Sequence, residues 1–68
     1  MKLIEKIAKN IEFRRKKLDI SVDRLSKKAD ISLSALNKIR RLDSSFVRVE
    51  TLHALAKALG CKMDDLIQ

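Results

Sequence analysis

The chain has 68 residues, of which 16 are Lys or Arg and nine are Asp or Glu, so its net charge is +7. We expect one domain spanning residues 1–68, and a small one, because a chain of this length buries only about 60% of its unfolded surface. No run approaches the roughly 20 apolar residues of a membrane span and no signal-peptide segment is present, so we expect a cytoplasmic protein without membrane contact. One cysteine, Cys61, excludes an internal disulfide and fits a small apolar residue in a reducing compartment.

The positive charge is concentrated in the first part of the chain. Residues 1–41 carry thirteen basic and five acidic side chains, a balance of +8, whereas residues 42–68 carry three and four, a balance of −1. This asymmetry favours one side that faces a polyanion and another that is kept for packing or self-association. A lysine-rich surface that is merely solvated is the alternative.

The sequence offers little for enzyme chemistry. His53 is the only histidine, and no second His or Cys stands at metal-ligand spacing. There is also no Gly-rich phosphate loop and no nucleophile paired with a base. We therefore expect no catalytic residues, no metal and no cofactor. A core this small leaves little room for a small-molecule effector, so none is expected.

The spacing of apolar residues predicts a first helix over residues 3–18. Its apolar stripe consists of Leu3, Ile4, Ile7, Ala8, Ile11 and Leu18. Arg15 lies in the same stripe, so its guanidinium must snorkel outward or find a partner in Glu12 or Asp19. Phe13 falls nearly opposite the stripe, and we expect the amino-terminal turn or a second subunit to cover it.

Two short helices joined by a tight turn are predicted next. Ser21 caps the second helix, which ends near Ala29, and Ser32 caps the third, which covers about residues 33–41. Asp30 lies in the turn, where a left-handed backbone is expected. The apolar sides of the two helices meet through Leu25, Ala29, Ile31, Leu36 and Ile39. Polar side chains are left on the outer face of the third helix: Ser34, Asn37, Lys38 and Arg41.

The last part of the chain is predicted to hold a loop and two helices. The apolar residues of 42–48 show no helical spacing, so this segment is predicted to be a loop. Phe46 or Val47 is expected to anchor it to the core. A strongly amphipathic fourth helix follows and ends before Gly60, which takes the C′ position. One short fifth helix lies within residues 61–68. The expected architecture is therefore all-α, a compact five-helix bundle.

Several stretches carry a family resemblance. They are Arg15 within IEFRRKKLDIS, Leu25 and Ser26 within DRLSKKADIS, the turn residue Ile31, Leu36 and Ile39 of the third helix, and the segment ETLHALAKALGCKMDDLI. In this order and spacing the chain resembles the Cro/cI-type (XRE-like) helix-turn-helix domains of phage and bacterial repressors. The resemblance implies a lambda-repressor-like bundle that binds double-stranded DNA, bacterial or phage-encoded and nucleoid-associated.

The resemblance also implies which residues meet DNA. The third helix would be the recognition helix in the major groove, as part of a sequence-specific transcriptional regulator, expected to be a repressor. Contacts with bases, or with the phosphates beside them, are then expected from Leu33, Ser34, Asn37 and Lys38. Phosphate contacts are expected from Ser21, Val22 and Ser32 at the helix starts, from Arg41 and Ser44 in the loop that begins at Arg41, and, on the ground of their charge, from Arg14 and Arg40.

One such helix covers only a few base pairs, so we expect a homodimer on a palindromic operator. The near-neutral charge and leftover apolar residues of the last part of the chain suggest the contact surface. Its members would be Phe46, Val47, Met63, Leu66 and Ile67. The alternative is that these side chains merely close the core of one subunit.

The chain departs from the family pattern in its turns and in one ion pair. Asp30 replaces the usual turn glycine, and no glycine follows the third helix around Leu42. Arg40 stands where many relatives have a glutamate that pairs with the arginine matching Arg15. Two arginines cannot form that bridge, so either Arg15 is paired locally or Arg40 turns outward to join Arg41 on DNA.

A second reading of the function stays open. Val22 replaces a glutamine that the family uses on DNA, and Leu33 is apolar at a base-reading position, although it could press against a thymine methyl. Both favour an antitoxin-like or anti-repressor module on the same scaffold. The charge of residues 1–41 counts against it, because the protein partner would have to be acidic.

Overall fold

The computed structural model describes residues 2–43 and 46–68. That part of the chain contains five helices and no strand, which confirms the predicted all-α, five-helix architecture. The helices are α1 (Leu3–Lys17), α2 (Val22–Lys28), α3 (Leu33–Arg40), α4 (Val49–Leu59) and α5 (Met63–Ile67).

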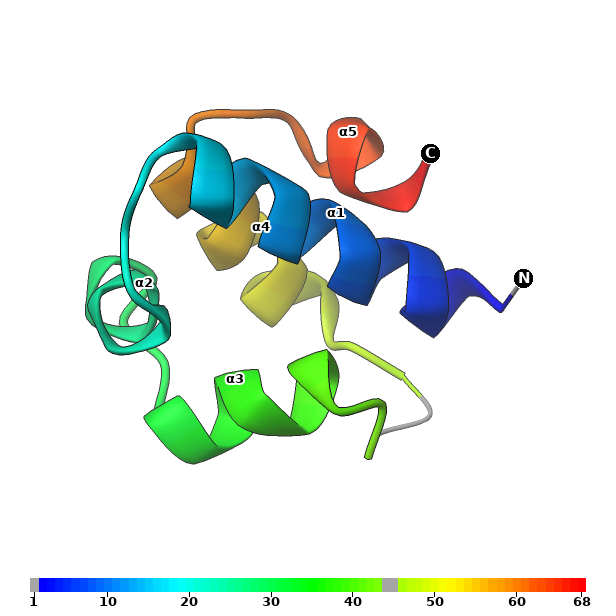
Figure 1. Cartoon of the computed structure of the whole chain (residues 1–68). Coiled ribbons are helices and arrows are strands. Elements are labelled where there is room, and N and C mark those ends of the chain that lie inside the picture. Colours follow the sequence, from blue (N-terminus) through cyan, green and yellow to red (C-terminus); the bar gives the residue numbers. More distant parts are fainter. Residues whose placement is uncertain (1, 44–45) are drawn as a thin grey trace.

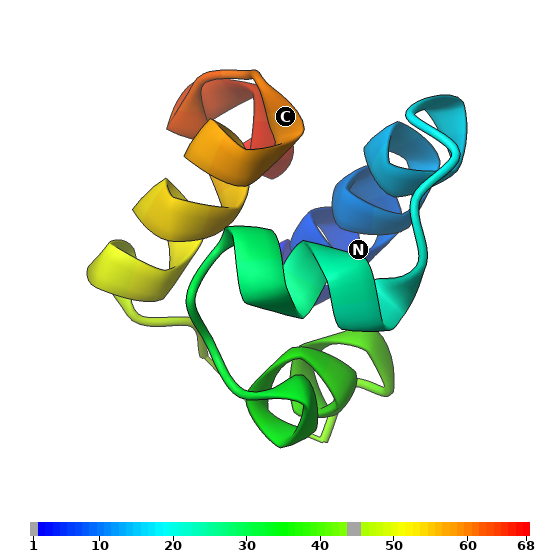
Figure 2. The same cartoon turned by 90° about the vertical axis from the view of Figure 1, so that its left-hand side faces the viewer.

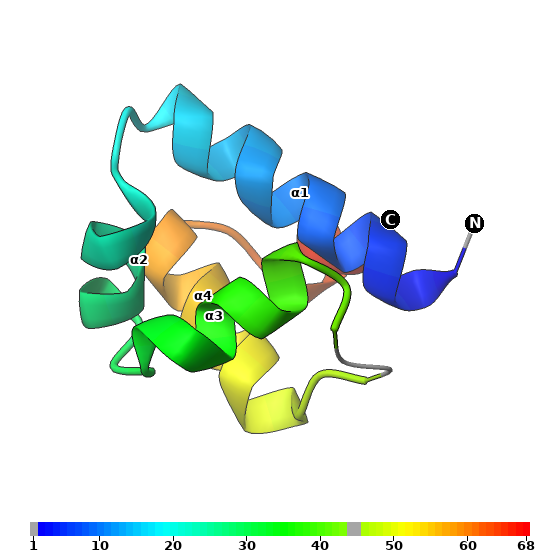
Figure 3. The same ribbon diagram turned by 60° about the horizontal axis from the view of Figure 1, so that its bottom comes forward.

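The helices surround one core, with α3 and α5 at opposite ends of the molecule (Figure 1). Helix α2 crosses over α3 (Figure 2); α2 packs against α4, α3 packs against α1, and α1 packs against α4. Helix α1 also packs along α5, where the Asn10 amide donates hydrogen bonds to the backbone oxygens of Leu66, at 2.9 Å, and Gln68, at 3.0 Å. Figure 3 shows α3 in front of α4, with no helix covering its outer side.

The buried core is the one that helical spacing predicts, except for Leu3 and Leu18 at the two ends of the first helix. It consists of Ile4, Ile7, Ile11, Leu25, Ala29, Leu36, Ile39, Leu52, Leu55, Ala56, Leu59 and Leu66. Leu66 is completely buried, so the prediction that it contacts a second subunit is wrong: it closes the core of a single copy. Val47 packs against this core and pins the loop before α4, whereas Phe46 is 70% exposed and does not.

The helix ends follow from local hydrogen bonding. The Oγ of Ser21 accepts from the backbone N–H of Arg24, and the Oγ of Ser32 accepts from that of Ala35, both at 3.0 Å. Both predicted N-caps are thus confirmed, and each satisfies a backbone donor that has no partner within its helix. Helix α4 ends at Gly60, whose φ of 71° is left-handed, as its predicted place after the helix requires.

The ends of α1 differ from the prediction. Leu3 and Leu18 are exposed rather than part of the buried stripe. Phe13 is 59% exposed, so the amino-terminal turn does not cover it. The Nζ atom of Lys17 instead lies 5.0 Å from the centroid of the Phe13 ring, within range of a cation–π contact.

Three non-glycine residues of the described chain have a left-handed backbone: Asp19, Asp30 and Leu42. Asp30 was expected to do so, and its short polar side chain tolerates the conformation. Leu42 has a φ of 62° directly after α3, the place where the family resemblance leads us to expect a glycine. Its Cβ makes this conformation unfavourable, so Leu42 stores strain that a glycine there would not.

The Leu42→Gly variant should therefore be more stable than the wild type, by about 1 kcal/mol in the free energy of unfolding. Relief of the left-handed strain outweighs the entropy cost of a new glycine, and little burial is lost because Leu42 is 48% exposed. Urea denaturation followed by circular dichroism measures the difference.

Leu18→Gly is the matched control. Leu18 is 47% exposed and also follows a helix, but its φ is −83°, so glycine there adds only flexibility and should destabilise the protein. Equal effects of the two substitutions would contradict the strain at Leu42.

Candidate nucleic-acid interface

The α2–turn–α3 unit is held by a small buried residue. Ser26 is almost fully buried, and its Oγ donates to the backbone oxygen of Asp23 at 2.6 Å. Its own carbonyl accepts from the N–H of Ile31, at 3.0 Å, which fixes the turn. The hydroxyl is therefore satisfied within α2, and its small size lets the core helices pack closely around it.

The outer side of α3 carries the residues predicted to meet bases. Leu33, Ser34, Asn37 and Lys38 line one shallow hollow, together with Arg41 and Asp43. Leu33, Ser34 and Lys38 are exposed and Asn37 is half-buried, while Leu36 and Ile39 are buried in the core. The structure thus gathers all four predicted base-reading residues on one accessible surface. We call the six residues that line the hollow the α3 surface.

The α3 surface is cationic but not uniformly so. Lys38 and Arg41 are both exposed there, which suits a phosphate backbone. Asp43 adds one carboxylate, and its backbone N–H donates to the oxygen of Lys38 at 2.8 Å, closing the end of α3. Asp43 was not anticipated from the sequence, because its place depends on the left-handed turn at Leu42. Its oxygens can only accept hydrogen bonds, as from a cytosine amino group.

Three of the predicted phosphate-binding residues begin helices α2 and α3. Ser21 and Ser32 are exposed, and their Oγ atoms accept capping bonds, which leaves each hydroxyl hydrogen available to donate. Val22 packs its side chain against the core, so only its backbone can reach a phosphate.

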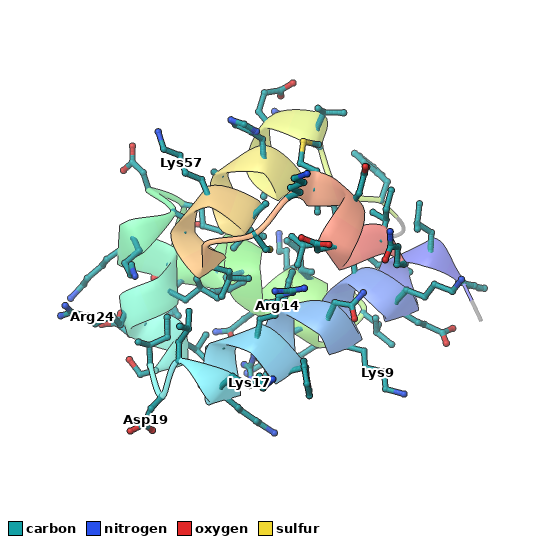
Figure 4. All side chains as sticks on the ribbon, turned by 90° about the horizontal axis from the view of Figure 1, so that it is seen from above. Lys9, Arg14, Lys17, Asp19, Arg24 and Lys57 are labelled. Atoms are coloured by element: carbon teal, nitrogen blue, oxygen red, sulfur yellow. The ribbon has the colours of Figure 1, made fainter. Side chains whose placement is uncertain are left out.

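Two other predicted phosphate contacts do not join this surface. Arg14 lies on the side of α1 that faces the α4–α5 connection, close enough to Cys61 for its charge to oppose the rise in pKa that burial gives that thiol. Figure 4 shows Arg14 from this side, opposite α3, so the structure does not bring it together with Lys38 and Arg41. Ser44 lies outside the described residues.

A carboxylate shared by two arginines joins α1 to α3. Glu12 accepts from Arg15 through both oxygens, at 3.2 Å and 2.7 Å, and from the Nε of Arg40 at 2.6 Å. The Nη1 of Arg15 also donates to the backbone oxygen of Ile20 at 2.6 Å, which anchors the segment between α1 and α2. Of the two partners that the sequence left open for Arg15, Glu12 and Asp19, the structure shows Glu12.

The same geometry decides between the two alternatives for the arginines. Arg15 is paired locally, and Arg40 does not turn outward: its guanidinium donates to Glu12 and, through Nη1, to the Oδ1 of Asn37 at 2.9 Å. The alternative in which Arg40 turns outward is wrong. That rotation would break the bonds of Arg40 to Glu12 and Asn37 and would leave Glu12 with Arg15 as its partner. Arg40 is therefore a poorer phosphate ligand than Arg41, which the structure leaves exposed.

The two arginines hold Glu12 in its charged form. The hydrogen bonds from Arg15 have the largest effect and lower the pKa of Glu12. Burial of the carboxylate opposes them, and the hydrogen bond and charge of Arg40 lower the pKa further. As a result the pKa falls from 4.5 to about 2. The cluster is only partly exposed, so solvent screens it less than a surface ion pair.

Comparison with known proteins shows the family to which the chain belongs. Residues 10–68 match the family of Cro/C1-type HTH DNA-binding domains. The chain belongs to this family. Among solved structures it is similar to the P22 c2 repressor protein in complex with synthetic operator 9T in the presence of Tl+, with a TM-score of 0.80 and 35% identity over 91% of this chain and 92% of that one. Comparison with the curated proteins found no match.

Membership of the Cro/C1-type family makes the chain an HTH DNA-binding domain and not an enzyme. It confirms the family resemblance inferred from the sequence, and the five-helix bundle is of the type that the P22 c2 repressor has. None of the described helices is long and apolar enough to cross a bilayer. In residues 2–43 and 46–68, no three His, Cys, Asp or Glu side chains form a group that could hold a metal ion.

The Glu12 cluster makes stability depend on pH at the acidic end. Because the folded-state pKa of about 2 lies below the model-peptide value of 4.5, the stabilisation is present above about pH 4.5 and is lost as the pH falls toward 2. Glu12→Gln should cost about 2 kcal/mol of unfolding free energy near pH 7, and progressively less below pH 4.5.

Urea denaturation of both proteins across this pH range measures the difference. Asp23→Asn is the matched control, because Asp23 pairs with Lys27 at 3.1 Å on an exposed face of α2. That substitution should change stability little at any pH. A cost of Glu12→Gln that stays constant from pH 7 to pH 2 would contradict the shifted pKa.

Proposed function

We propose that the chain is a sequence-specific transcriptional regulator that reads the major groove with α3 and represses from a palindromic operator as a homodimer, with residues 1–68 acting as one DNA-binding domain. The observation that carries this is the α3 surface, where Leu33, Ser34, Asn37 and Lys38 lie together beside Arg41. Repression is supported by the similarity to the P22 c2 repressor, which was crystallised with a synthetic operator.

The dimensions of α3 support insertion into the groove. Its eight residues make a helix about 12 Å long, and a helix of about 10–12 Å diameter fits a major groove about 12 Å wide. With the outer side of α3 uncovered, the exposed side chains can reach base edges while Lys38 and Arg41 reach the flanking phosphates. Ser21 and Ser32, at the starts of α2 and α3, are placed to donate to the same backbone.

Lys38→Ala and Arg41→Ala should each weaken binding to DNA and reduce its salt dependence. Each loses about one phosphate contact, so the slope of log affinity against log salt should fall by about 0.9 in magnitude. Fluorescence anisotropy at several salt concentrations measures both quantities.

Lys57→Ala and Arg14→Ala are the matched controls for charge. Both residues belong to the side opposite α3 shown in Figure 4, so the affinity and the slope should stay close to those of the wild type. If the controls weaken binding as much as Lys38→Ala and Arg41→Ala, the cationic surface is elsewhere.

The size of the domain allows two copies to lie side by side on adjacent half-sites of DNA. Its Cα extents are 26 × 22 × 20 Å, and a side-chain layer of about 3 Å on each side brings the longest to roughly 32 Å. Two adjacent copies therefore hold equivalent helices about one turn of DNA apart, near the 34 Å repeat of half-sites. With Leu66 in the core and Val47 and Met63 packed against it, Phe46 and Ile67 are the exposed apolar members of the proposed contact.

Selection of bound sequences from a random DNA pool tests recognition and symmetry together. We expect a palindrome with half-sites about 34 Å apart or a multiple of that distance. Sedimentation of the DNA complex should show two protein chains per site. A non-palindromic site bound by one chain would contradict the dimer and leave DNA recognition standing.

A protein-interaction module on the same scaffold is the second candidate, antitoxin-like or anti-repressor in role. Leu33 is exposed and apolar, Val22 offers no side-chain hydrogen bond, and Asp43 places a carboxylate on the α3 surface. Mixed genomic DNA fragments distinguish the two: retention at low salt that weakens at moderate salt supports DNA binding, and no retention at either supports a protein partner.

A further inference from the structure

The Asn37 amide has a defined orientation before any ligand binds. Its Oδ1 accepts from the Nη1 of Arg40 at 2.9 Å. A guanidinium carries only donors, so the oxygen of the amide, and not its NH₂ group, must face Arg40. The NH₂ group is therefore turned away from Arg40. Asn37 also lines the hollow of the α3 surface, where a base edge would lie.

Arg40 is itself held from a different helix. Its Nε donates to the Oε1 of Glu12 at 2.6 Å, and Glu12 is held in turn by both hydrogen bonds from Arg15. Figure 3 shows the carboxyl end of α3 next to α1, where these side chains meet. The Asn37 amide is thus the end of a chain of charge-assisted hydrogen bonds that begins at the backbone of Ile20.

This orientation has a consequence for base reading. Bidentate pairing with adenine needs the oxygen and the NH₂ group of an asparagine at one base edge, because adenine offers an acceptor, N7, beside a donor, the N6 amino group. Guanine offers two acceptors, N7 and O6, and no donor at that edge. The bond from Arg40 takes one of the two lone pairs of the Asn37 oxygen and turns that oxygen toward Arg40, whereas the NH₂ group, which only donates, faces away. An amide held in this way matches the two acceptors of guanine better than the acceptor and donor of adenine.

We propose that Arg40 is a positioning residue that holds the Asn37 oxygen and so directs the chain to read guanine, rather than adenine, at the base facing Asn37. The proposal rests on the proposed DNA-binding function. It gives Arg40 a role in specificity through its hydrogen bonds to Glu12 and Asn37.

The test compares the base preference of three proteins: the wild type, Arg40→Met and Arg40→Lys. Selection from a random DNA pool first gives the preferred site. Affinities are then measured for two sites that differ only in having guanine or adenine at one position. Asn37→Ala identifies that base pair, as the position where preference is lost. The wild type should favour guanine over adenine there, and both Arg40 variants should lower this ratio about tenfold.

The two Arg40 variants are chosen so that folding and charge are controlled. Arg40→Met leaves Glu12 paired with Arg15, so no unpaired carboxylate is created. Arg40→Lys keeps the charge beside Glu12, but an ammonium group on one stem cannot reproduce the fork that bridges Glu12 and Asn37. A purely structural role would weaken binding to both sites equally and leave their ratio unchanged.

A double-mutant cycle adds the decisive control. In an Asn37→Ala background, Arg40→Met should have no further effect on the guanine-to-adenine ratio. An adenine preference in the wild type, or an unchanged ratio in both Arg40 variants, overturns the positioning role and leaves the proposed function intact. If the wild type selects no sequence at all, both the proposed function and the positioning role are overturned.

Discussion

The burial of one side of α3 is the constraint on which the functional surface depends. Leu36 is completely buried and Ile39 nearly so, in a core shared with α1, α2 and α4. Fixing these two side chains fixes the rotation of the helix, since residues at other angles around its axis must then face outward. Asn37 and Lys38 reach the surface for this reason, and the Ser32 cap and the Asp30 turn set where the helix begins.

The Glu12 cluster adds precision to this arrangement. Hydrophobic burial sets the rotation of α3 but does not determine side-chain rotamers on its outer face. The ion pair from α1 to Arg40 restrains the end of α3, and the bond from Arg40 to Asn37 extends that restraint to the α3 surface. In this chain the acidic partner is on α1 and the second arginine is on α3. An ion pair therefore still joins α1 to α3, and the guanidinium of Arg40 lies beside Asn37 as a hydrogen-bond donor.

Patterns of local spacing predicted most of the fold. The caps at Ser21 and Ser32, the left-handed Asp30 and the end of α4 at Gly60 depend on a few neighbouring residues, so the sequence reveals them. The role of Arg40 is different, because its contact with Glu12 joins residues 28 positions apart, and neither propensity nor periodicity reports such pairs. Local patterns also do not show which side of the folded domain a charge lies on. The charge of Arg14 alone therefore predicted a phosphate contact, although Arg14 lies on the side of the domain opposite α3.

The central claim is that the outer side of α3 meets DNA, and nuclear magnetic resonance tests it residue by residue. Adding a selected duplex to ¹⁵N-labelled protein should shift the amide signals of residues 33–41 and of the start of α2 most, with the carboxyl end of α4 around Lys57 nearly unchanged. The largest shifts on α5 or on the far side of α4, with residues 33–41 unaffected, would contradict the account.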